Sequence, residues 1–396
     1  MLDWVIIGGG IHGVHIAARL IGEVGVDLEH IRIVDPGDRL LERWRTFTAT
    51  TGMRHLRSPS VHNLDMNPWS LMQFAGKRRE RKKGLFAPPF NRPSLDFFND
   101  HCDKVIGTFE LSRVHVRAKV EQCSLSCDRV SVVLSTGEQL STANVVLAIG
   151  SAERPNWPQW APTGDPRVQH VFSEGFDGWP RTRERVVVVG GGISAGQVAL
   201  RLVDEGHDVQ VVSRHGMREH QFDSDPGWLG PRNMKGFLRE TNVDKRRSMI
   251  RDARHKGSVP PDVRRALNHA IEKDQVQWIE GQVEDLHSHE SGFTMKLASG
   301  DVLEGQRVLL ATGFASQRPG GRLVDHLVES AALPCASCGY PIVDKTLRWH
   351  PRVYVSGPLA ELELGPSSRN IAGARRAADR LVAAARSQRR NAGGVQ

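Results

Sequence analysis

The chain has 396 residues, of which 39% are hydrophobic and 25% are charged, a balance typical of globular proteins with sizeable cores. No run approaches the roughly 18 consecutive apolar residues of a membrane span, and an apolar segment begins almost at Met1, so we expect a cytoplasmic protein without a cleavable signal peptide. Five cysteines in so long a chain argue against a disulfide-built secreted protein, and a net charge of +8 favours an anionic partner, either nucleic acid or a negatively charged cofactor.

The first element is an apolar strand that ends in a cluster of glycines. The spacing Gly8-x-Gly10-x-x-Gly13 allows a tight turn, a close approach of the backbone to a pyrophosphate, and close packing of the following helix. A second apolar strand over residues 31–34 ends at Asp35, where a carboxylate would hydrogen-bond a ribose hydroxyl. The segment therefore predicts a βαβ unit that binds a dinucleotide. His12 and His15 could form a metal pair, but the pyrophosphate should occupy that space.

Residues 36–99 lack clear periodicity and are rich in Arg, Pro, Trp and His, which predicts a long irregular section that shapes a site. Much of the positive charge lies there in residues 77–83 (KRRERKK). No aromatic residues interleave with these charges and the chain has only two tyrosines, so we interpret the run as a solvated loop and expect no nucleic-acid or membrane partner.

A helix should then begin near Leu95, capped by Ser94, with Leu95, Phe98, Cys102 and Val105 on its buried face. Alternating residues predict three antiparallel strands over 113–120, 130–134 and 139–142, followed by a separate buried strand over 144–150 that ends at Gly150.

A proline cluster over residues 155–166 indicates a linker, and beyond it the opening pattern is repeated. An apolar strand from residue 185 leads into Gly190-x-Gly192-x-Ser194-Ala195 and a helix. The next strand, 208–212, ends in Ser213-Arg214, and a hydroxyl with a guanidinium suits a 2′-phosphate. The first site should therefore bind an FAD-like ligand and the second NADPH.

The remaining elements complete a fold of two similar halves. Arginine pairs at 246–247 and 264–265 should lie on helices, and strands are expected over 276–279, 293–297, 307–313 and 353–357. The strand from Arg307 ends at Gly313, and a last helix should cover 370–386 with a frayed tail from Gln388. We predict an α/β protein with two Rossmann-like domains: a discontinuous FAD-binding domain over 1–155 and 319–396, and an inserted NADPH-binding domain over 156–318.

With two glycine fingerprints about 180 residues apart, the chain resembles the two-dinucleotide-binding-domain flavoproteins. Within them it is most similar to the FAD- and NADPH-dependent single-component monooxygenases, in particular the branch that N-hydroxylates ornithine and lysine. That branch carries the motif Asp-x-x-x-Leu/Phe-Ala-Thr-Gly-Tyr-x-x-x-x-His/Pro, which here runs from Gln306 through Ala311-Thr-Gly313 and Phe314 to Pro319, with Gln in place of Asp and Phe in place of Tyr. A Leu-Lys-Asp triplet common in the branch is Leu56-Arg57-Ser58 here. The fingerprint of the broader monooxygenases is degenerate, represented only by His170, Phe172, Gly175 and Trp179.

The resemblance implies that NADPH reduces FAD and that the reduced flavin forms a C4a-(hydro)peroxyflavin with dioxygen, which oxygenates a small molecule at N, S or a carbonyl. It implies backbone contact of Val120 with the adenine, and approach of Gly357 and the segment from Leu364 to the flavin ring. We add Arg57 as the candidate for a catalytic charged group near the flavin. A homo-oligomer is left open.

Two alternatives stay open at this point. Cys335-x-x-Cys338 would make the protein an NADPH-dependent flavin disulfide reductase if the pair were redox-active. A flavoprotein that binds nucleotides without turnover is the other. Glu361 and Glu363 could form an acid/base pair, but we interpret them as alternating residues of a loop before the last helix.

Overall fold

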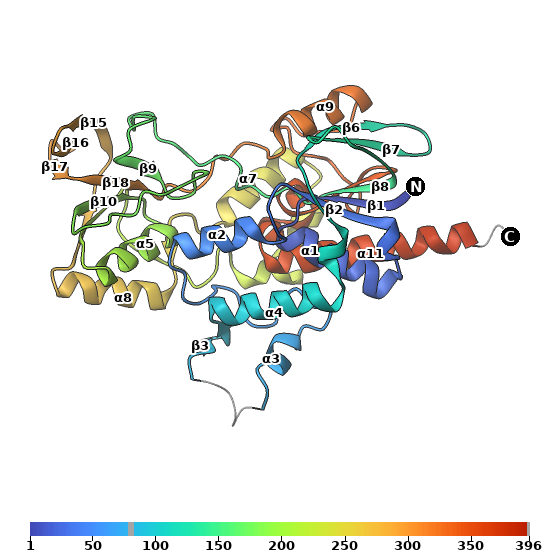
Figure 1. Cartoon of the computed structure of the whole chain (residues 1–396), viewed down its shortest axis with the longest axis horizontal. Coiled ribbons are helices and arrows are strands. Elements are labelled where there is room, and N and C mark those ends of the chain that lie inside the picture. The colour runs from blue at the N-terminus through green and yellow to red at the C-terminus, as the bar shows by residue number, and fades with distance from the viewer. Residues whose placement is uncertain (78–82, 394–396) are drawn as a thin grey trace.

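The computed structural model describes residues 1–77 and 83–393, so five residues of the basic run predicted as a loop lie outside the described part. The chain forms two lobes, each built on a largely parallel sheet, with α2 (Glu42–Thr50) and α7 (Val243–Ala253) between them (Figure 1). In the described residues no helix is long and apolar enough to cross a membrane.

The first lobe is organised around β1, which has parallel neighbours on both sides. The sheet order is β19-β20-β8-β1-β2-β5, with Ile6 opposite Ile33 on one side and Val146 on the other. Val5 and Ile6 are fully buried because helices or further strands cover both faces of the sheet. Its strands are β1 (Leu2–Ile7), β2 (Ile31–Asp35), β5 (His115–Arg117), β8 (Gln139–Leu147), β19 (Arg348–His350) and β20 (Val353–Val355).

Helices from both ends of the chain cover one face of this sheet. α1 (Ile11–Arg19) packs against α11 (Ile371–Gly393), and α4 (Leu95–Thr108) completes the layer with Phe98 in the same core. The other face is covered by α9 (Gly321–Ala331) and by the antiparallel strands β6 (Val120–Leu125) and β7 (Val130–Leu134). Sequence positions about 370 residues apart therefore share one hydrophobic core.

The second lobe has a five-stranded, fully parallel sheet in the order β14-β11-β10-β18-β9. Its strands are β9 (Val168–His170), β10 (Arg185–Val189), β11 (Asp208–Ser213), β14 (Val276–Glu280) and β18 (Arg307–Leu310). α5 (Ile193–Asp204) and α8 (Pro261–Glu272) cover one face, and a three-stranded antiparallel sheet covers the other. That small sheet consists of β15 (Val283–His289), β16 (Gly292–Leu297) and β17 (Val302–Gly305).

Side chains of the irregular section join the two lobes. Arg92 is 1% exposed and its guanidinium lies 3.0 Å from the carboxylate of Asp262 at the start of α8. Arg54 pairs in the same way with Asp204 of α5, at 2.5 Å. The section therefore has a structural task as well as the site-shaping one that we expected from its length.

The predicted helix at Leu95 and the apolar stripe of the last helix are confirmed, but several boundaries were wrong. The strand expected over 113–120 is divided: β5 joins the parallel sheet through β2, and β6 begins only at Val120. The two strands expected over 139–142 and 144–150 are the single strand β8. The section over 36–99 contains α2 and the short helix α3 (Ser70–Phe74). α11 begins at Ile371, separate from the 3₁₀ turn at Pro366–Arg369, and continues past Gln388 to Gly393.

Candidate functional site: two glycine turns

The two glycine turns share a positive φ, a close carbonyl oxygen and a hydrogen bond to the next strand. Gly8 has a φ of 111° and Gly190 a φ of 152°, values that an L side chain rarely adopts. A Cβ on Gly8 would lie 2.6 Å from the carbonyl oxygen of Ala148, and one on Gly190 would lie 2.5 Å from that of Ala311. In both turns the glycine N–H donates a 2.9 Å hydrogen bond to the last-but-one residue of the next strand, Val34 or Val212. The repeat seen in the sequence is therefore a repeat in space.

The third position of each turn shows how closely helix and strand pack. A Cβ on Gly13 would lie 1.8 Å from the carbonyl oxygen of Gly8, so no side chain fits there. Ala195 occupies the corresponding position of the second turn and is fully buried. The helix therefore approaches the strand more closely at the first turn than at the second.

The middle glycines face the space where a ligand phosphate would lie. Among the described residues, a Cβ on Gly10 would meet no atom within 4 Å, and one on Gly192 would meet only Gly257, at 3.6 Å. α1 begins at Ile11 and α5 at Ile193, so the unpaired N–H groups and positive dipole end of each helix point at this space. The residues present therefore fit the pyrophosphate of a dinucleotide in both turns.

The strand ends differ chemically, as the sequence predicted. The carboxylate of Asp35 accepts hydrogen bonds from the N–H of Gly9 at 2.7 Å and of Gly37 at 2.9 Å, which fixes it beside the first turn. Ser213 is buried, and its hydroxyl lies where a side chain on Gly191 would be. Arg214 is exposed. In the described part of the chain it has no hydrogen-bond or ion-pair partner, so its guanidinium is available to a ligand.

His12, for which the sequence predicted no cofactor role, lies at the first turn. Its Nδ1 is 2.8 Å from the hydroxyl of the fully buried Ser356, and its Nε2 is buried without a hydrogen-bond partner among the described residues. Burial lowers the pKa of His12 to about 4, so the ring is neutral at pH 7. Gly357, with a φ of 66°, lies against the same ring. In the sequence, the sign of this contact was the pair Ser356-Gly357 directly after an apolar strand.

His15 has a structural partner. Its Nδ1 lies 2.8 Å from the carbonyl oxygen of Leu64, and burial lowers its pKa to about 3. The described residues contain no group of three or more His, Cys, Asp or Glu side chains that could hold a metal.

The remaining candidate residues lie at different places around the two turns. Arg57 donates hydrogen bonds to the carbonyl oxygens of Gln221, at 2.9 Å, and His220, at 2.5 Å, and to the hydroxyl of Ser258. Val120 is buried at the start of β6. Gly150 and Gly313 follow the strands that flank the two turns, and a Cβ on either would meet no atom of the described chain within 4 Å.

The acidic pair at 361 and 363 lies in a helix, α10 (Glu361–Leu364), and not in a loop as we expected. Glu361 is fully buried between Arg247 and Arg369, with 2.7 Å to Arg369 Nε. Glu363 is 8% exposed and pairs with Arg246 at 3.2 Å and with Arg380 at 2.8 Å. Pairing with four arginines from α7, the 3₁₀ turn and α11 explains why both carboxylates tolerate burial. Alternating acids in sequence gave no sign of these partners.

The family model described as pyridine nucleotide-disulphide oxidoreductase matches residues 5–249, more than half of the chain. The chain belongs to this family. It is therefore an oxidoreductase, and the matched residues include both glycine turns. No curated protein sequence is significantly similar to it.

Solved structures of this oxidoreductase fold cover the chain almost completely. The ornithine hydroxylase PvdA of Pseudomonas aeruginosa has 17% sequence identity and a TM-score of 0.76, with 98% of this chain and 99% of that chain covered. The ornithine N-hydroxylase of Kutzneria sp. 744 has 17% identity and a TM-score of 0.79, covering 98% and 100%. The bacillithiol disulfide reductase of Bacillus cereus has 17% identity and a TM-score of 0.63, covering 98% and 99%. At these identities the likeness establishes the fold.

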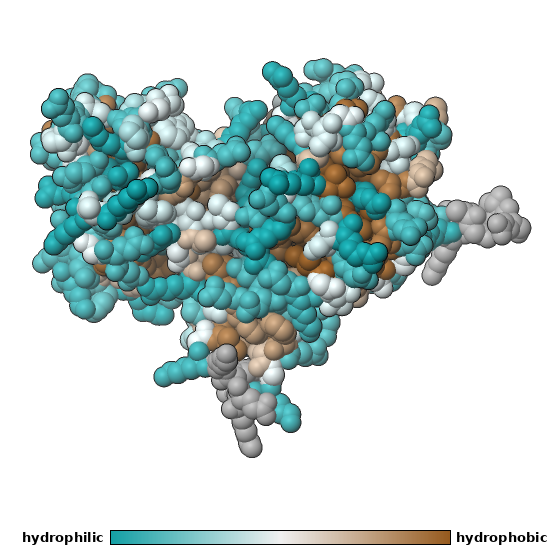
Figure 2. Space-filling view, viewed as in Figure 1, coloured by the Kyte–Doolittle hydropathy of each residue, from teal (hydrophilic) through white to brown (hydrophobic). Residues whose placement is uncertain are grey.

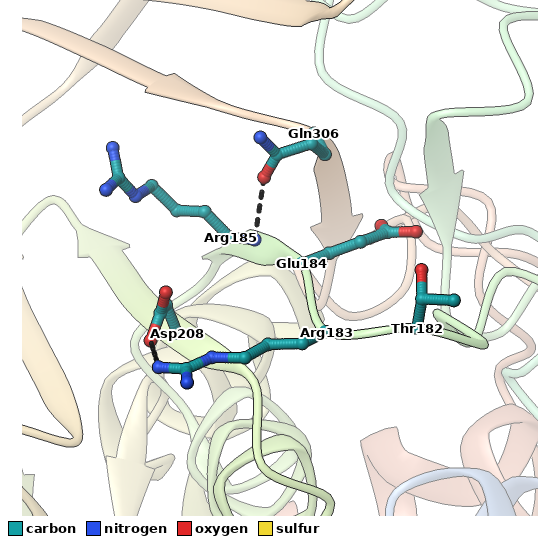
Figure 3. Close-up of a pocket in the computed structure, with 6 residues that line it drawn as sticks. All are labelled: Thr182, Arg183, Glu184, Arg185, Asp208 and Gln306. Carbon is teal, nitrogen blue, oxygen red and sulfur yellow. Dashed lines mark hydrogen bonds and ion pairs between the residues drawn. The ribbon is translucent and has the colours of Figure 1, made fainter.

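A surface depression of about 560 Å³ in this oxidoreductase lies away from the glycine turns. Figure 3 shows its lining around the amino ends of β10 and β11, where Arg183 pairs with Asp208 at 2.8 Å and the Arg185 N–H donates to Gln306 at 2.7 Å. Open parallel sheets bind ligands beyond the carboxyl ends of their strands. The depression is therefore not the dinucleotide site, and Gln306 has a structural role here.

The cysteine pair and the altered motif residues also have defined surroundings. Cys335 and Cys338 are free thiols in a small hairpin, and burial raises the pKa of Cys335.

Phe314 stacks on Phe172 with ring centres 4.9 Å apart. His170 Nε2 lies 3.1 Å from the hydroxyl of Thr312. The rings of Phe314, Phe172 and His170 are therefore part of the packing of the second lobe.

Proposed function

We propose that the chain is an NADPH-dependent flavoprotein monooxygenase that binds FAD at the first turn and NADPH at the second, and oxygenates a small molecule at N, S or a carbonyl with dioxygen. The observation that carries the proposal is that two turns with the same backbone contacts are followed by strands with different ends. Asp35 suits a ribose diol, whereas Arg214, next to the hydroxyl of Ser213, suits a 2′-phosphate. One chain with both sites can pass a hydride from one dinucleotide to the other.

Each half of the chain would then hold one cofactor. Residues 1–155 and 319–396 would form the FAD domain, in which the N–H groups after Gly8 and Gly10 hold the pyrophosphate and Gly13 permits close packing. Val120, Gly150 and Gly357 would border the adenine and flavin ends. In the inserted domain over 156–318, the residues facing NADPH would be Gly190, Gly192, Ser194, Ser213, Arg214 and Gly313.

Bound flavin would supply hydride acceptance and oxygen activation, and the protein's share would be binding, orientation and exclusion of water. Arg57 is held by carbonyl oxygens of residues 220 and 221, so its charge would stay fixed beside the site. We place the enzyme in the cytoplasm, and a homo-oligomer stays open.

Purified protein tests the proposal directly. We expect bound flavin, oxidation of NADPH in preference to NADH, and oxygen uptake stimulated by one member of a panel of amines, thioethers, ketones and organic acids. Protein that carries flavin but never oxidises NADPH would favour a nucleotide-binding role without turnover.

A disulfide reductase is the second candidate, because the family includes such enzymes and the Cys335/Cys338 pair is present. Reactive cysteines have lowered pKa values, whereas burial raises that of Cys335. Thiol titration before and after reduction by NADPH separates the two: a gain of two thiols coupled to turnover would replace the monooxygenase proposal.

A further inference from the structure

The region between the two glycine turns contains more positive than negative side chains. We call five of its cations the cationic cluster. The described carboxylates near it are those of Asp223, Glu361 and Asp262, and Asp262 also pairs with Arg92. The members of the cluster are Arg57, Arg247, Arg254, Lys256 and Arg369.

Two chain segments place the cluster next to both proposed cofactor sites. Lys256 directly precedes Gly257, the residue that faces Gly192 of the second turn. Arg369 precedes the first residue of α11, and its backbone lies against the His12 ring of the first turn. Figure 1 shows α7, which carries Arg247, between the two lobes, and the space-filling view in Figure 2 shows that the surface is hollowed between them.

Part of the cluster is neutralised within the protein. Glu361 pairs with both Arg247 and Arg369, and the guanidinium of Arg247 also lies 4.0 Å from the ring centre of Tyr340. Arg369 donates a further hydrogen bond to the hydroxyl of Tyr340, at 3.1 Å. These contacts hold α7 against α10, and they leave the carboxylate of Glu361 fully paired within the protein.

The other part keeps one unused donor and one unpaired charge. Arg254 pairs with Asp223 through Nη2 at 2.7 Å, but its Nη1 is buried and has no hydrogen-bond partner in the described chain. Lys256 is exposed and forms no ion pair within residues 1–77 and 83–393. Burial, followed by the charges of Arg254, Arg369 and Arg247, lowers the pKa of Lys256. The buried donor of Arg254 is costly until an acceptor binds, and the exposed Lys256 adds an unpaired positive charge beside it.

We propose that the substrate is a small organic anion, a carboxylate or a phosphate ester, held by Arg254 and Lys256, and that cationic amines such as ornithine and lysine are not substrates. The inference rests on the proposed function, because the cluster acts on a substrate only if the cofactors lie at the two turns. An amino group brought to this region would face like charges, whereas a carboxylate or phosphate would supply the missing acceptor.

Calorimetry and flavin absorbance on the oxidised holoenzyme, saturated with NADP⁺, test the assignment with three probes: glutarate, inorganic phosphate and L-ornithine. We expect glutarate or phosphate to bind and to perturb the flavin spectrum, and L-ornithine to do neither. A response to glutarate alone identifies a carboxylate substrate, and a response to phosphate alone identifies a phosphate ester.

Lys256→Gln should weaken anion binding about 10- to 100-fold, the range for one hydrogen bond to a charged group. Arg254→Gln, which should act in the same direction, is a second variant. Lys296→Gln makes the same change on the separate three-stranded sheet, where the lysine pairs with Glu284 at 3.6 Å, and should leave binding unchanged.

Each titration is repeated without NADP⁺, and three results would overturn the assignment: binding of neither anion under both conditions, equal anion affinity in Lys256→Gln and wild type, or anion binding to the NADP⁺-free enzyme that NADP⁺ abolishes. The last would assign the cluster to the nucleotide phosphates. Flavin content and reduction of the flavin by NADPH, measured on the same samples, report failure of the proposed function separately, since calorimetry detects anion binding with or without flavin.

Discussion

Replacing Gly10 by alanine should remove FAD binding and leave the fold intact. The φ of Gly10 is −78°, which alanine adopts without strain, and a Cβ built there meets no atom of residues 1–77 and 83–393 within 4 Å. The only cost to the apoprotein comes from alanine being a poorer N-cap than glycine at the start of α1, about 0.5–1 kcal/mol. The added methyl group would instead occupy the space that we assign to the pyrophosphate.

The size of the binding effect follows from the hydrogen bonds that the methyl group displaces. A hydrogen bond to a charged group contributes about 1.5–3 kcal/mol, so loss of two between backbone N–H groups and phosphate costs about 3–6 kcal/mol. That corresponds to an increase of about 10²- to 10⁴-fold in the Kd for FAD. Fluorescence titration of the apoprotein with FAD measures the Kd, and thermal unfolding of the same apoprotein measures stability.

Gly13→Ala is the matched control, because the same change three residues later meets the carbonyl oxygen of Gly8 at 1.8 Å. The clash is between two backbone segments, the start of α1 and the end of β1, which cannot move apart without disturbing their packing. We therefore expect the free energy of unfolding to fall by at least the usual cost of overpacking, about 1–3 kcal/mol. Wild-type FAD affinity in Gly10→Ala would refute the position of the pyrophosphate. Wild-type stability in Gly13→Ala would refute the contact between α1 and β1.

Three further substitutions test other parts of the structure. Arg214→Ala should raise the KM for NADPH about 10- to 100-fold and leave that for NADH unchanged, since one charged contact to a 2′-phosphate is lost; equal effects on both cofactors would contradict the assignment. Arg92→Gln should lower the free energy of unfolding by about 3–5 kcal/mol because it leaves Asp262 beside a buried gap. Arg113→Gln, at a solvent-exposed pair, should have a much smaller effect, and chemical denaturation compares the two. Because burial keeps the His12 ring neutral, only the unfolded chain binds a proton between about pH 6.5 and about pH 4, so the free energy of unfolding falls as the pH drops through that range. His12→Gln should reduce this fall by roughly 3 kcal/mol when unfolding is measured across the range. An unchanged pH profile would contradict the burial of a neutral ring.

Local chemistry made the two βαβ units predictable. A short apolar run followed by Gly-x-Gly-x-x-Gly or Gly-x-Gly-x-x-Ala admits few conformations, because Gly8 and Gly190 need φ values that other residues avoid. The ends of the strands at Asp35 and Ser213 followed from the same spacing, since the apolar run stops where the sheet does.

Elements whose register depends on distant partners were predicted poorly. Residues 115–117 form a strand only because β2 offers an unpaired edge, and nothing within residues 113–120 marks the change of partner at Lys119. α2 has few apolar residues, so its sequence resembled a loop.

The unpredicted part of the site has the same origin. Glu361 is acceptable in the core only because Arg247 and Arg369 reach it from two other elements. His12 was visible in the sequence, but its partner Ser356 lies 344 positions away. Long-range polar pairs of this kind leave no periodic trace in either segment.

The packing of α11 on α1 determines when the first cofactor site can exist during synthesis. β1 and α1 leave the ribosome long before α11, with which they share a core, and before Ser356, which holds His12. All five strands of the second parallel sheet lie between residues 168 and 310. The second lobe can therefore fold before α11, which the first lobe needs, has been synthesised. A nascent chain should therefore be able to bind NADPH before it can bind FAD, and a chain truncated before residue 371 should keep the second site and lack the first.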